Sequence, residues 1–320
     1  MIVAGIISMA PLIGIYNVEK SFGDKVVLKN VRIEINKGEI FGIVGASGCG
    51  KTTLLKVIMG FYRPNEGTIE YNSKNVTGNT SALSKFFGFS AQDNCYYEDL
   101  TVSENLMYYG RLYGIPKKKL KERIDRLLAN FSLTDSKKVV AKKLSGGMGR
   151  RLDLACAIIH EPEVLILDEP TEGLDPVLRK NMWNIIKQIN KNGTTIIVAS
   201  HLLDEVEILC QRVAILRNGA AETIVSTERL KSYKFKAQKI AIETLPGNYG
   251  TIINELVKAK APVNYAVARE GRLIVYTQNP QLFLQIQSST LSKIGERLLS
   301  MEMKGPNLEE LFEFMTRKRK

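Results

Sequence analysis

The pattern of apolar and polar positions predicts two kinds of strand. Residues 13–35 alternate roughly between polar and apolar side chains, with a turn at Gly23-Asp24, which indicates antiparallel strands. Four later runs are apolar throughout, as in strands that a parallel sheet buries on both faces. These runs are residues 40–44, 86–90, 164–167 and 195–199. The pattern therefore predicts an α/β core in which an antiparallel β subdomain accompanies a parallel sheet.

Helical spacing of apolar residues dominates the stretch between the second and third runs. It covers residues 102–160 and includes residues 117–128, which are charged on one side and apolar on the other. Because this stretch separates two strands of the predicted sheet, we expect a helical subdomain over about residues 101–160.

The segment after about Thr227 has a pattern of its own. It predicts, in chain order, a strand over 239–244, a helix over 249–260, strands over 263–268 and 273–277, a helix over 281–294 and a strand over 297–303. This β-α-β-β-α-β order is that of a small α+β ferredoxin-like domain. A last helix is expected over residues 308–317. We therefore predict two domains, residues 1–226 and residues 227–320.

The composition fits an ordinary globular protein. The chain has 320 residues, 44% apolar and 24% charged, which is enough for a sizeable core. No run of about 18 to 20 uninterrupted apolar residues is present, so no membrane-spanning helix is expected. Residues 1–15 lack a basic start and are interrupted by Pro11 and Gly14, which favours a short apolar arm over a secretory signal. The four cysteines show no close pairing, as expected of free cytosolic thiols.

The formal net charge is +12, and +7 of it falls in the last 90 residues. A basic surface can serve nucleic acid or an anionic membrane face. A lysine-rich solvated surface is the commoner case and the one we expect here, with no nucleic-acid partner. We interpret the basic end, residues 317–320, as a solvated tail, with membrane contact as the alternative.

A glycine-rich string follows the first apolar run. It reads Gly45-Ala46-Ser47-Gly48-Cys49-Gly50-Lys51-Thr52 and fits the phosphate-binding pattern G-x-x-x-x-G-K-[ST]. Glycines let the backbone curl so that several N–H groups point at one phosphate. Lys51 adds a positive charge, and the Thr52 hydroxyl can ligate Mg²⁺. An apolar strand before the string and an apolar helix after it make a plain glycine turn the poorer interpretation.

Two carboxylates follow the third apolar run. Burying the carboxylates of Asp168 and Glu169 at the end of a strand costs free energy, so such residues are expected there only if they bind a metal or activate a water molecule. Asp168 is the natural partner of Mg²⁺, either as a direct ligand or through a water molecule that the ion holds. Glu169 is the natural general base for an attacking water.

Polar residues also follow the two remaining runs. Gln92 comes after the second and His201 after the fourth. Ligands of open parallel sheets bind at the carboxyl ends of the strands, so all these strand ends predict a single site. Taken alone, Gln92 could be an ordinary loop residue and His201 a structural histidine.

The string Leu144-Ser145-Gly146-Gly147-Met148 precedes a helix expected to run to about His160. A serine and two glycines at a helix N-terminus form an anion site, and the same string would also serve as an ordinary N-cap. Together with the phosphate loop and the acidic pair in this order, it resembles the signature motif of ATP-binding-cassette (ABC) ATPases. That motif defines the family, whose core is a P-loop nucleotide hydrolase.

Further residues are in register with this family over about residues 16–217. Phe22 stands where the family has an aromatic residue that stacks on adenine, Gln92 matches the Q-loop, Asp175 the D-loop and His201 the switch histidine. Asp175 before Pro176 would also be a plain N-cap with proline at N1. The departures are mild, since Phe22 replaces the commoner tyrosine and Met148 the usual glutamine.

The resemblance implies roles for these residues. Catalytic roles fall to Glu169, His201 and Gln92, and Mg²⁺ contacts to Thr52, Asp168 and Gln92. The nucleotide-binding residues would be Phe22, Gly45, Ala46, Ser47, Gly48, Cys49, Gly50, Lys51, Thr52, Thr53, Ser145, Gly146, Gly147 and Asp175.

The family also implies a head-to-tail dimer, either of identical or of different ATPase subunits. Each ATP would lie between the phosphate loop of one subunit and Ser145 to Gly147 of the other. Hydrolysis would power a transmembrane permease on another chain, which places this chain at the cytoplasmic face of the membrane as a peripheral subunit. Tyr96, Tyr97 and Leu100 could meet that permease or pack onto the helical subdomain.

The strings Gly146–Leu152 and Pro306–Phe312 resemble the branch of the family that serves drug, sodium, antibiotic or polysaccharide exporters. One alternative is a soluble ABC ATPase of translation or DNA maintenance, but those usually carry two cassettes or a long coiled coil. A regulator built on an inactive cassette would have lost Lys51, Glu169 or His201. A nucleotide-free DNA binder would leave the phosphate loop unexplained.

Overall fold

The computed structural model describes residues 10–228, 238–269 and 271–304. The chain divides into two compact units, Met1–Thr227 and Glu228–Lys320. The helix predicted over residues 308–317, the basic end and residues 1–9 of the apolar arm lie outside the described residues. Each unit is described by itself.

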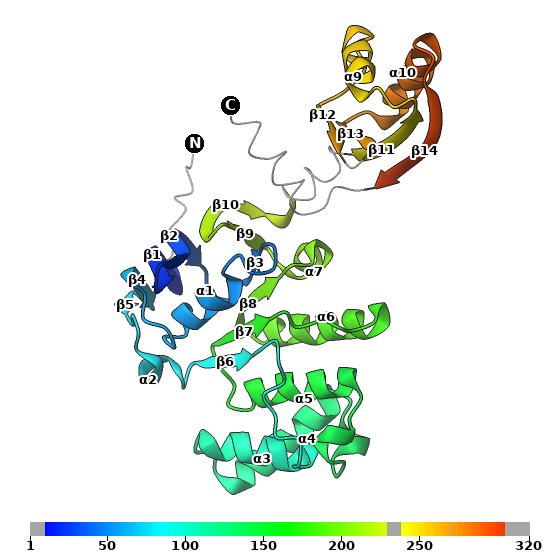
Figure 1. Ribbon diagram of the computed structural model, residues 1–320. Coiled ribbons are helices and arrows are strands. Elements are labelled where there is room, and N and C mark those ends of the chain that lie inside the picture. The colour runs from blue at the N-terminus through cyan, green and yellow to red at the C-terminus, as the bar shows by residue number, and fades with distance from the viewer. Residues whose placement is uncertain (1–9, 229–237, 270, 305–320) are drawn as a thin grey trace, which may run out of the picture. The chain divides into compact units, whose positions relative to one another are not determined.

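An antiparallel sheet of four strands forms one layer of the first unit (Figure 1). Its order is β2-β1-β4-β5, with β1 (Ile13–Phe22), β2 (Lys25–Ile35), β4 (Glu66–Tyr71) and β5 (Lys74–Asn75). The β1–β2 hairpin, with its turn at Gly23-Asp24, confirms the prediction from the alternating pattern. Strands β4 and β5 were not predicted.

A sheet of six strands forms the second layer. Its order is β10-β9-β3-β8-β7-β6, with β3 (Ile40–Val44), β6 (Phe87–Ser90), β7 (Val164–Asp168), β8 (Thr195–Ser200), β9 (Arg212–Arg217) and β10 (Ala220–Ser226). The four apolar runs form the parallel strands β3, β8, β7 and β6, as predicted. Strand β9 joins them in parallel and β10 pairs antiparallel with β9, and neither was predicted.

Helix α1 (Lys51–Ile58) packs between the two sheets and shares their core. Its Leu54, Leu55 and Ile58 are fully buried together with Ile13 of β1 and Phe41 of β3. Because α1 begins directly after the glycine-rich loop, this core fixes the loop at the carboxyl end of β3.

A bundle of helices follows β6 in the chain (Figure 1). It contains α3 (Val102–Leu112), α4 (Lys117–Asn130) and α5 (Gly146–Ile158), all within the predicted helical stretch. Thr101 and Glu104 form a reciprocal capping box at the start of α3. The first unit also contains α2 (Thr80–Leu83), α6 (Pro176–Lys191) and α7 (Leu203–Leu209).

The second unit has its own sheet and core. Its elements are β11 (Gln238–Leu245), α9 (Tyr249–Lys258), β12 (Tyr265–Arg269), β13 (Arg272–Thr277), α10 (Pro280–Lys293) and β14 (Arg297–Lys304). The sheet is antiparallel in the order β12-β13-β11-β14. The core includes Ile240, Ile242, Leu273 and Phe283. The elements follow the predicted order, and the ferredoxin-like assignment stays a prediction.

None of the helices in the described ranges is long and apolar enough to cross a membrane. Cys49, Cys95, Cys156 and Cys210 are all free thiols.

Candidate functional site

The loop between β3 and α1 has a backbone that only glycine allows. Gly48 has φ 77° and Gly50 has φ 109°, in the left-handed region that disfavours side chains. A Cβ atom on Gly45 would lie 2.3 Å from the carbonyl oxygen of Leu216. The loop therefore folds as a concave turn at the N-terminus of α1, which is a binding geometry for a phosphate.

The buried ammonium of Lys51 lies at the centre of this loop. Its Nζ donates to the carbonyl oxygens of Gly45 at 2.9 Å and Ala46 at 3.3 Å. It also lies 3.2 Å from Oε1 of Glu169. The side chain is thus held across the loop and joins it to the end of β7.

Glu169 is the residue on which the strand ends converge. Its Oε2 accepts hydrogen bonds from the backbone N–H of His201 at 3.2 Å and lies 2.9 Å from Nδ1 of that histidine. Its own N–H donates to the carbonyl of Ala199 at 2.9 Å. Its φ is 49°, a left-handed conformation that costs a non-glycine residue about 1–3 kcal/mol. Such strain persists only where the surrounding structure enforces it. Here the strained backbone holds the carboxylate next to Lys51.

Asp168, the last residue of β7, has an oxygen without a partner. Its side chain is buried, and no described atom hydrogen-bonds to its Oδ1. Burial raises the pKa of this carboxyl, and a hydrogen bond with Thr52 opposes that shift. In the described ranges, no group of three or more acidic, histidine or cysteine side chains is arranged to hold a metal ion by itself. The side-chain oxygens of Thr52 and Asp168 fit Mg²⁺, which binds through one or two side-chain oxygens plus phosphates and water.

Gln92 lies on the surface just past β6, where its Nε2 donates to Oε2 of Glu172 at 2.8 Å. Its backbone is tied to the acidic pair by Arg150 of α5, whose guanidinium bonds carbonyls on both segments. Arg150 is a residue that the sequence reasoning missed. It lies one turn before the apolar Leu154 on α5, so its helical register places it on the buried face, and this was the available signal.

The signature residues and the D-loop aspartate lie apart from this cluster. Ser145 caps α5 by accepting from the N–H of Met148, and Asp175 caps α6 by accepting from Val177 and Leu178. Ser145, Gly146 and Asp175 are exposed. None of the hydrogen bonds or ion pairs in the described ranges joins Ser145 or Asp175 to Lys51 or Glu169. The N-cap interpretation of both residues is confirmed.

Phe22 ends β1 with its ring 44% exposed. The ring packs edge-on against Tyr62 at 5.3 Å between centroids, and the Nζ of Lys20 lies over it, 5.0 Å from its centroid. Within the loop, Ala46, Ser47 and Gly48 are exposed and Cys49 is half-buried. Burial raises the pKa of the Cys49 thiol, and the charge of Lys51 opposes that shift. Thr52 and Thr53 are half-buried at the start of α1.

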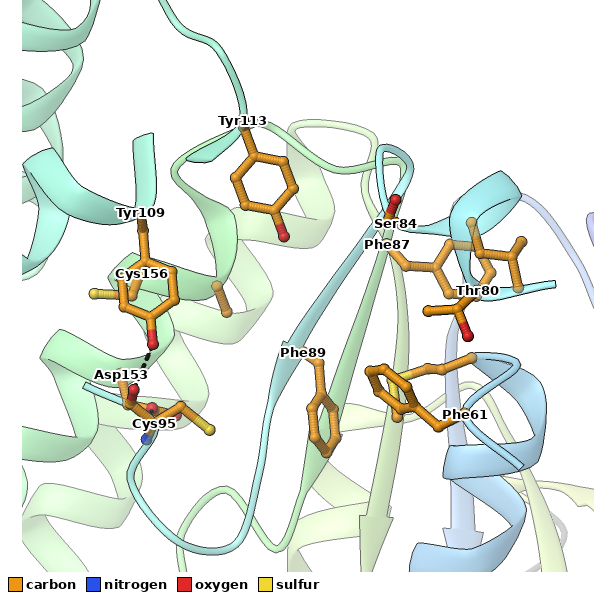
Figure 2. Close-up of a pocket in the computed structure, with 13 residues that line it drawn as sticks. Phe61, Thr80, Ser84, Phe87, Phe89, Cys95, Tyr109, Tyr113, Asp153 and Cys156 are labelled. Carbon is orange, nitrogen blue, oxygen red and sulfur yellow. Dashed lines mark hydrogen bonds between the residues drawn. The ribbon is translucent and has the colours of Figure 1, made fainter. Parts of the chain in front are cut away.

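An aromatic groove opens between the core and the helical bundle (Figure 2). Its volume is about 200 Å³. The core side includes Phe61, Phe87 and Phe89, and the bundle side includes Tyr109 and Tyr113. Phe61 is 56% exposed and Tyr113 39%. The groove is thus an apolar surface open to solvent.

The segment after Gln92 forms one wall of the groove. Asp153 of α5 accepts from the N–H of Cys95 at 2.7 Å and from the hydroxyl of Ser90, and Tyr109 donates to the carbonyl of Cys95. Burial raises the pKa of the Asp153 carboxyl, and the hydrogen bond from Ser90 opposes that shift. Beyond this anchor Tyr97 is 49% exposed, and Tyr96 and Leu100 are half-buried.

A phosphate loop, an acidic pair and a capped signature helix in one α/β unit define a nucleotide-hydrolysing cassette. The sequence profile of the ABC transporter family matches residues 28–172. The linearmycin resistance ATP-binding protein LnrL of Bacillus subtilis is 33% identical over 303 residues, which cover 92% of this chain and 95% of that protein. This chain therefore belongs to the ABC transporter family and is an ATP-binding, ATP-hydrolysing member of it.

Other relatives share this assignment. The Nod factor export ATP-binding protein I of Sinorhizobium fredii is 34% identical and is covered over 83% of its length, with 92% of this chain. The daunorubicin resistance ATP-binding protein DrrA3 of Streptomyces coeruleorubidus is 36% identical over 67% of this chain and 68% of its own length.

Solved structures match the first unit's fold. The ATP binding subunit of an ABC transporter has a TM-score of 0.63 and 26% identity, over 69% of this chain and 92% of its own. A dimeric ATP-binding cassette, MJ0796, in a post-hydrolysis state bound to ADP and Pi, has a TM-score of 0.61 and 26% identity, over 67% and 98%.

Proposed function

We propose that this chain binds ATP between two cassettes and hydrolyses it to power export through a permease on another chain. The observation that carries the chemistry is the convergence of Lys51 and His201 on the carboxylate of Glu169. The names of the relatives, linearmycin resistance and Nod factor export, favour transport over the alternative of a soluble ATPase in translation or DNA maintenance.

Glu169 is the general base of the proposed reaction. A γ-phosphate in the loop gives Lys51 a second anionic partner, which releases one oxygen of Glu169 to accept a proton from water. His201 holds the other oxygen in place through its backbone N–H and Nδ1. Gln92, at the end of the neighbouring strand β6, would contact Mg²⁺ and the attacking water.

Thr52 and Asp168 would hold Mg²⁺ in this proposal. The unpartnered, buried Oδ1 of Asp168 supports the assignment, because a buried acceptor without a partner is costly. When bound, the ion neutralises charge on the phosphate oxygens.

The cassettes bind ATP as a head-to-tail dimer. Ser145, Gly146 and Asp175 are exposed in a single chain and lie at the N-termini of α5 and α6, where backbone N–H groups attract anions. They therefore suit a phosphate that the other subunit holds. The exposed ring of Phe22 suits stacking on adenine.

The aromatic groove receives a cytoplasmic segment of the permease. The aromatic rings that line the groove are apolar and therefore favour an apolar partner. Cys95, which also lines the groove, belongs to the same loop as Gln92. A permease segment seated there therefore acts on the catalytic loop. This contact places the chain at the cytoplasmic face of the membrane as a peripheral subunit.

Replacing Glu169 tests the chemistry. The Glu169→Gln variant should bind a fluorescent ATP analogue like the parent and hydrolyse ATP about 10²- to 10⁴-fold more slowly, since general-base catalysis supplies that factor. Parent-like turnover would refute the role of Glu169.

Co-purification of the chain from membranes, followed by identification of its apolar partner, tests transport. A ribosomal or DNA-bound partner would support the alternative.

A further inference from the structure

One buried guanidinium joins three parts of the catalytic unit. Arg150 lies one turn into α5 and is 6% exposed. An arginine side chain has five N–H donors, and here five backbone carbonyls accept from it. They belong to Pro170 (Nε, 3.2 Å), Ala91 and Gln92 (Nη1, 2.7 and 3.0 Å), and Asp168 and Glu169 (Nη2, 3.2 and 2.8 Å).

These acceptors lie on two segments far apart in the sequence. Two are in the loop that follows β6 and carries Gln92, and three are at the end of β7 around Glu169. Arg150 itself belongs to the helix that Ser145 caps. A single side chain therefore sets the spacing between the Q-loop, the acidic pair and the signature helix.

The bond to Glu169 has a particular consequence. This residue has φ 49°, and its N–H is bound by Ala199 while its carbonyl is bound by Arg150. A left-handed conformation of a non-glycine residue relaxes when the groups that hold it are removed. Relaxation would rotate the carboxylate away from Lys51 and His201.

We propose that Arg150 is a positioning residue for hydrolysis, which holds the backbone of Glu169 and of Gln92 in register with the signature helix. The inference rests on the proposed role of Glu169 as base. Because Arg150 makes none of its hydrogen bonds to the phosphate loop, its loss should lower the turnover rate and leave ATP binding intact.

The test is Arg150→Lys in the full chain. Lysine keeps the charge but is a compact donor that cannot span both segments, unlike the planar guanidinium. We expect kcat to fall about 10- to 100-fold, the usual effect of a small misplacement in an active site. The affinity for a fluorescent ATP analogue should stay within about threefold of the parent.

Arg123→Lys is the matched control. Arg123 is also 6% exposed, and its guanidinium bonds the carbonyl of Ile159 and the carboxylate of Glu161, away from the catalytic segments. The Arg123→Lys variant should lose thermal stability much as the Arg150→Lys variant does, but it should keep the kcat of the parent. An equal fall of kcat in both variants would reduce the role of Arg150 to general stability and overturn the proposal, as would an unchanged kcat in Arg150→Lys.

A double-mutant cycle tests whether Arg150 acts through Glu169. If Arg150 acts through Glu169, adding Arg150→Lys to Glu169→Gln should lower kcat by clearly less than Arg150→Lys lowers it in the parent, and the remaining loss is the part that acts through Gln92. A full multiplicative loss would refute positioning through Glu169. If Glu169→Gln alone turns over like the parent, the proposed role of Glu169 as base fails. If only Arg150→Lys is harmless, this inference alone fails. Arg150→Gln, measured in the same way, decides the question should the lysine variant not fold.

Discussion

The ammonium of Lys51 lies 3.2 Å from Oε1 of Glu169, with both side chains more than nine-tenths buried. The cation that the loop presents to a phosphate is thus paired with the carboxylate assigned as base. A phosphate in the loop competes with Glu169 for Lys51. Nucleotide binding and release of the base are therefore one event in the proposed mechanism.

Removing the cation should weaken nucleotide binding. Lys51→Ala deletes a charge-assisted contact, which is typically about 1.5–3 kcal/mol, so the dissociation constant for ATP should rise about 10- to 100-fold. Titration with a fluorescent ATP analogue measures the change. Lys191→Ala, an exposed lysine in the last turn of α6, is the control and should bind like the parent. Unchanged affinity in Lys51→Ala would remove Lys51 from the phosphate site.

The signature serine should act on the nucleotide of the other subunit. Mixing Lys51→Ala protein with Ser145→Arg protein produces heterodimers that keep one intact composite site. Each variant alone should be nearly inactive, and the mixture should recover part of the parent ATPase rate. The recovery is read by phosphate release as the ratio of the two variants is changed. No recovery, with heterodimers shown to form, would count against action in trans.

A charge in the aromatic groove should uncouple ATP hydrolysis from the permease. Phe61→Arg places a cation that the apolar partner cannot desolvate, so permease-stimulated hydrolysis should fall while the basal rate persists. Val257→Arg, at a 62% exposed residue of the second unit, is the control. A thiol cross-linker should also join Cys95, which is exposed, to the permease. Normal stimulation of Phe61→Arg would exclude the groove as the docking site.

Acid should destabilise the fold through His160. Its ring stacks on Tyr113 at 3.7 Å and its Nε2 lies 3.1 Å from the carbonyl of Phe87. Burial lowers its pKa from 6.5 to about 4. Between these values the unfolded chain binds more protons than the folded one, so stability is lost as the pH falls from about 6.5 towards about 4.

The measurement is the midpoint of thermal unfolding across that pH range. Replacing His160 with Gln removes the titrating ring, so the midpoint should fall less between pH 6.5 and 4 than in the parent. The other acidic groups titrate in both proteins and cancel in the comparison. Identical slopes would mean that His160 does not stay neutral in the folded chain.

The second unit should be dispensable for ATP chemistry. A chain that ends at Glu228 keeps the hydrogen bonds that Thr227 makes to the carbonyls of Cys210 and Gln211. We expect it to stay folded with basal ATPase activity, and to lose dimer stability or coupling to transport. A cut at Val225 removes the pairing of Ser226 with Arg212 and should destabilise β10. Loss of activity in the longer form would make the second unit part of the catalytic fold.

Much of the site could be predicted because its chemistry is local. The loop from Gly45 to Thr52 needs glycines at fixed places whatever surrounds it, and Ser145 and Asp175 cap helices through bonds within three residues. The fully apolar runs predicted the parallel strands because only burial on both faces suits such runs.

The missed elements have less distinctive patterns. Strand β4 begins at Glu66, and its register with β1 shifts around Gly67, which has φ 84°, so its alternation is interrupted. Strand β9 has a short apolar run between two arginines, and such a run is compatible with either a strand or a helix. Their pairing with β1 and β3 depends on partners that are distant in the chain.

The sequence by itself determined the phosphate loop, the acidic pair and the four apolar strands of the parallel sheet, because neighbours in the chain are enough to specify them. Only the tertiary structure decided that Lys51 pairs with Glu169 and that His201 contacts the same carboxylate. It also decided that Arg150 bonds the backbone of Glu169 and of the Q-loop. These contacts join segments separated by long stretches of chain. They form only when the sheet aligns its strand ends and the core excludes water from the polar groups between them.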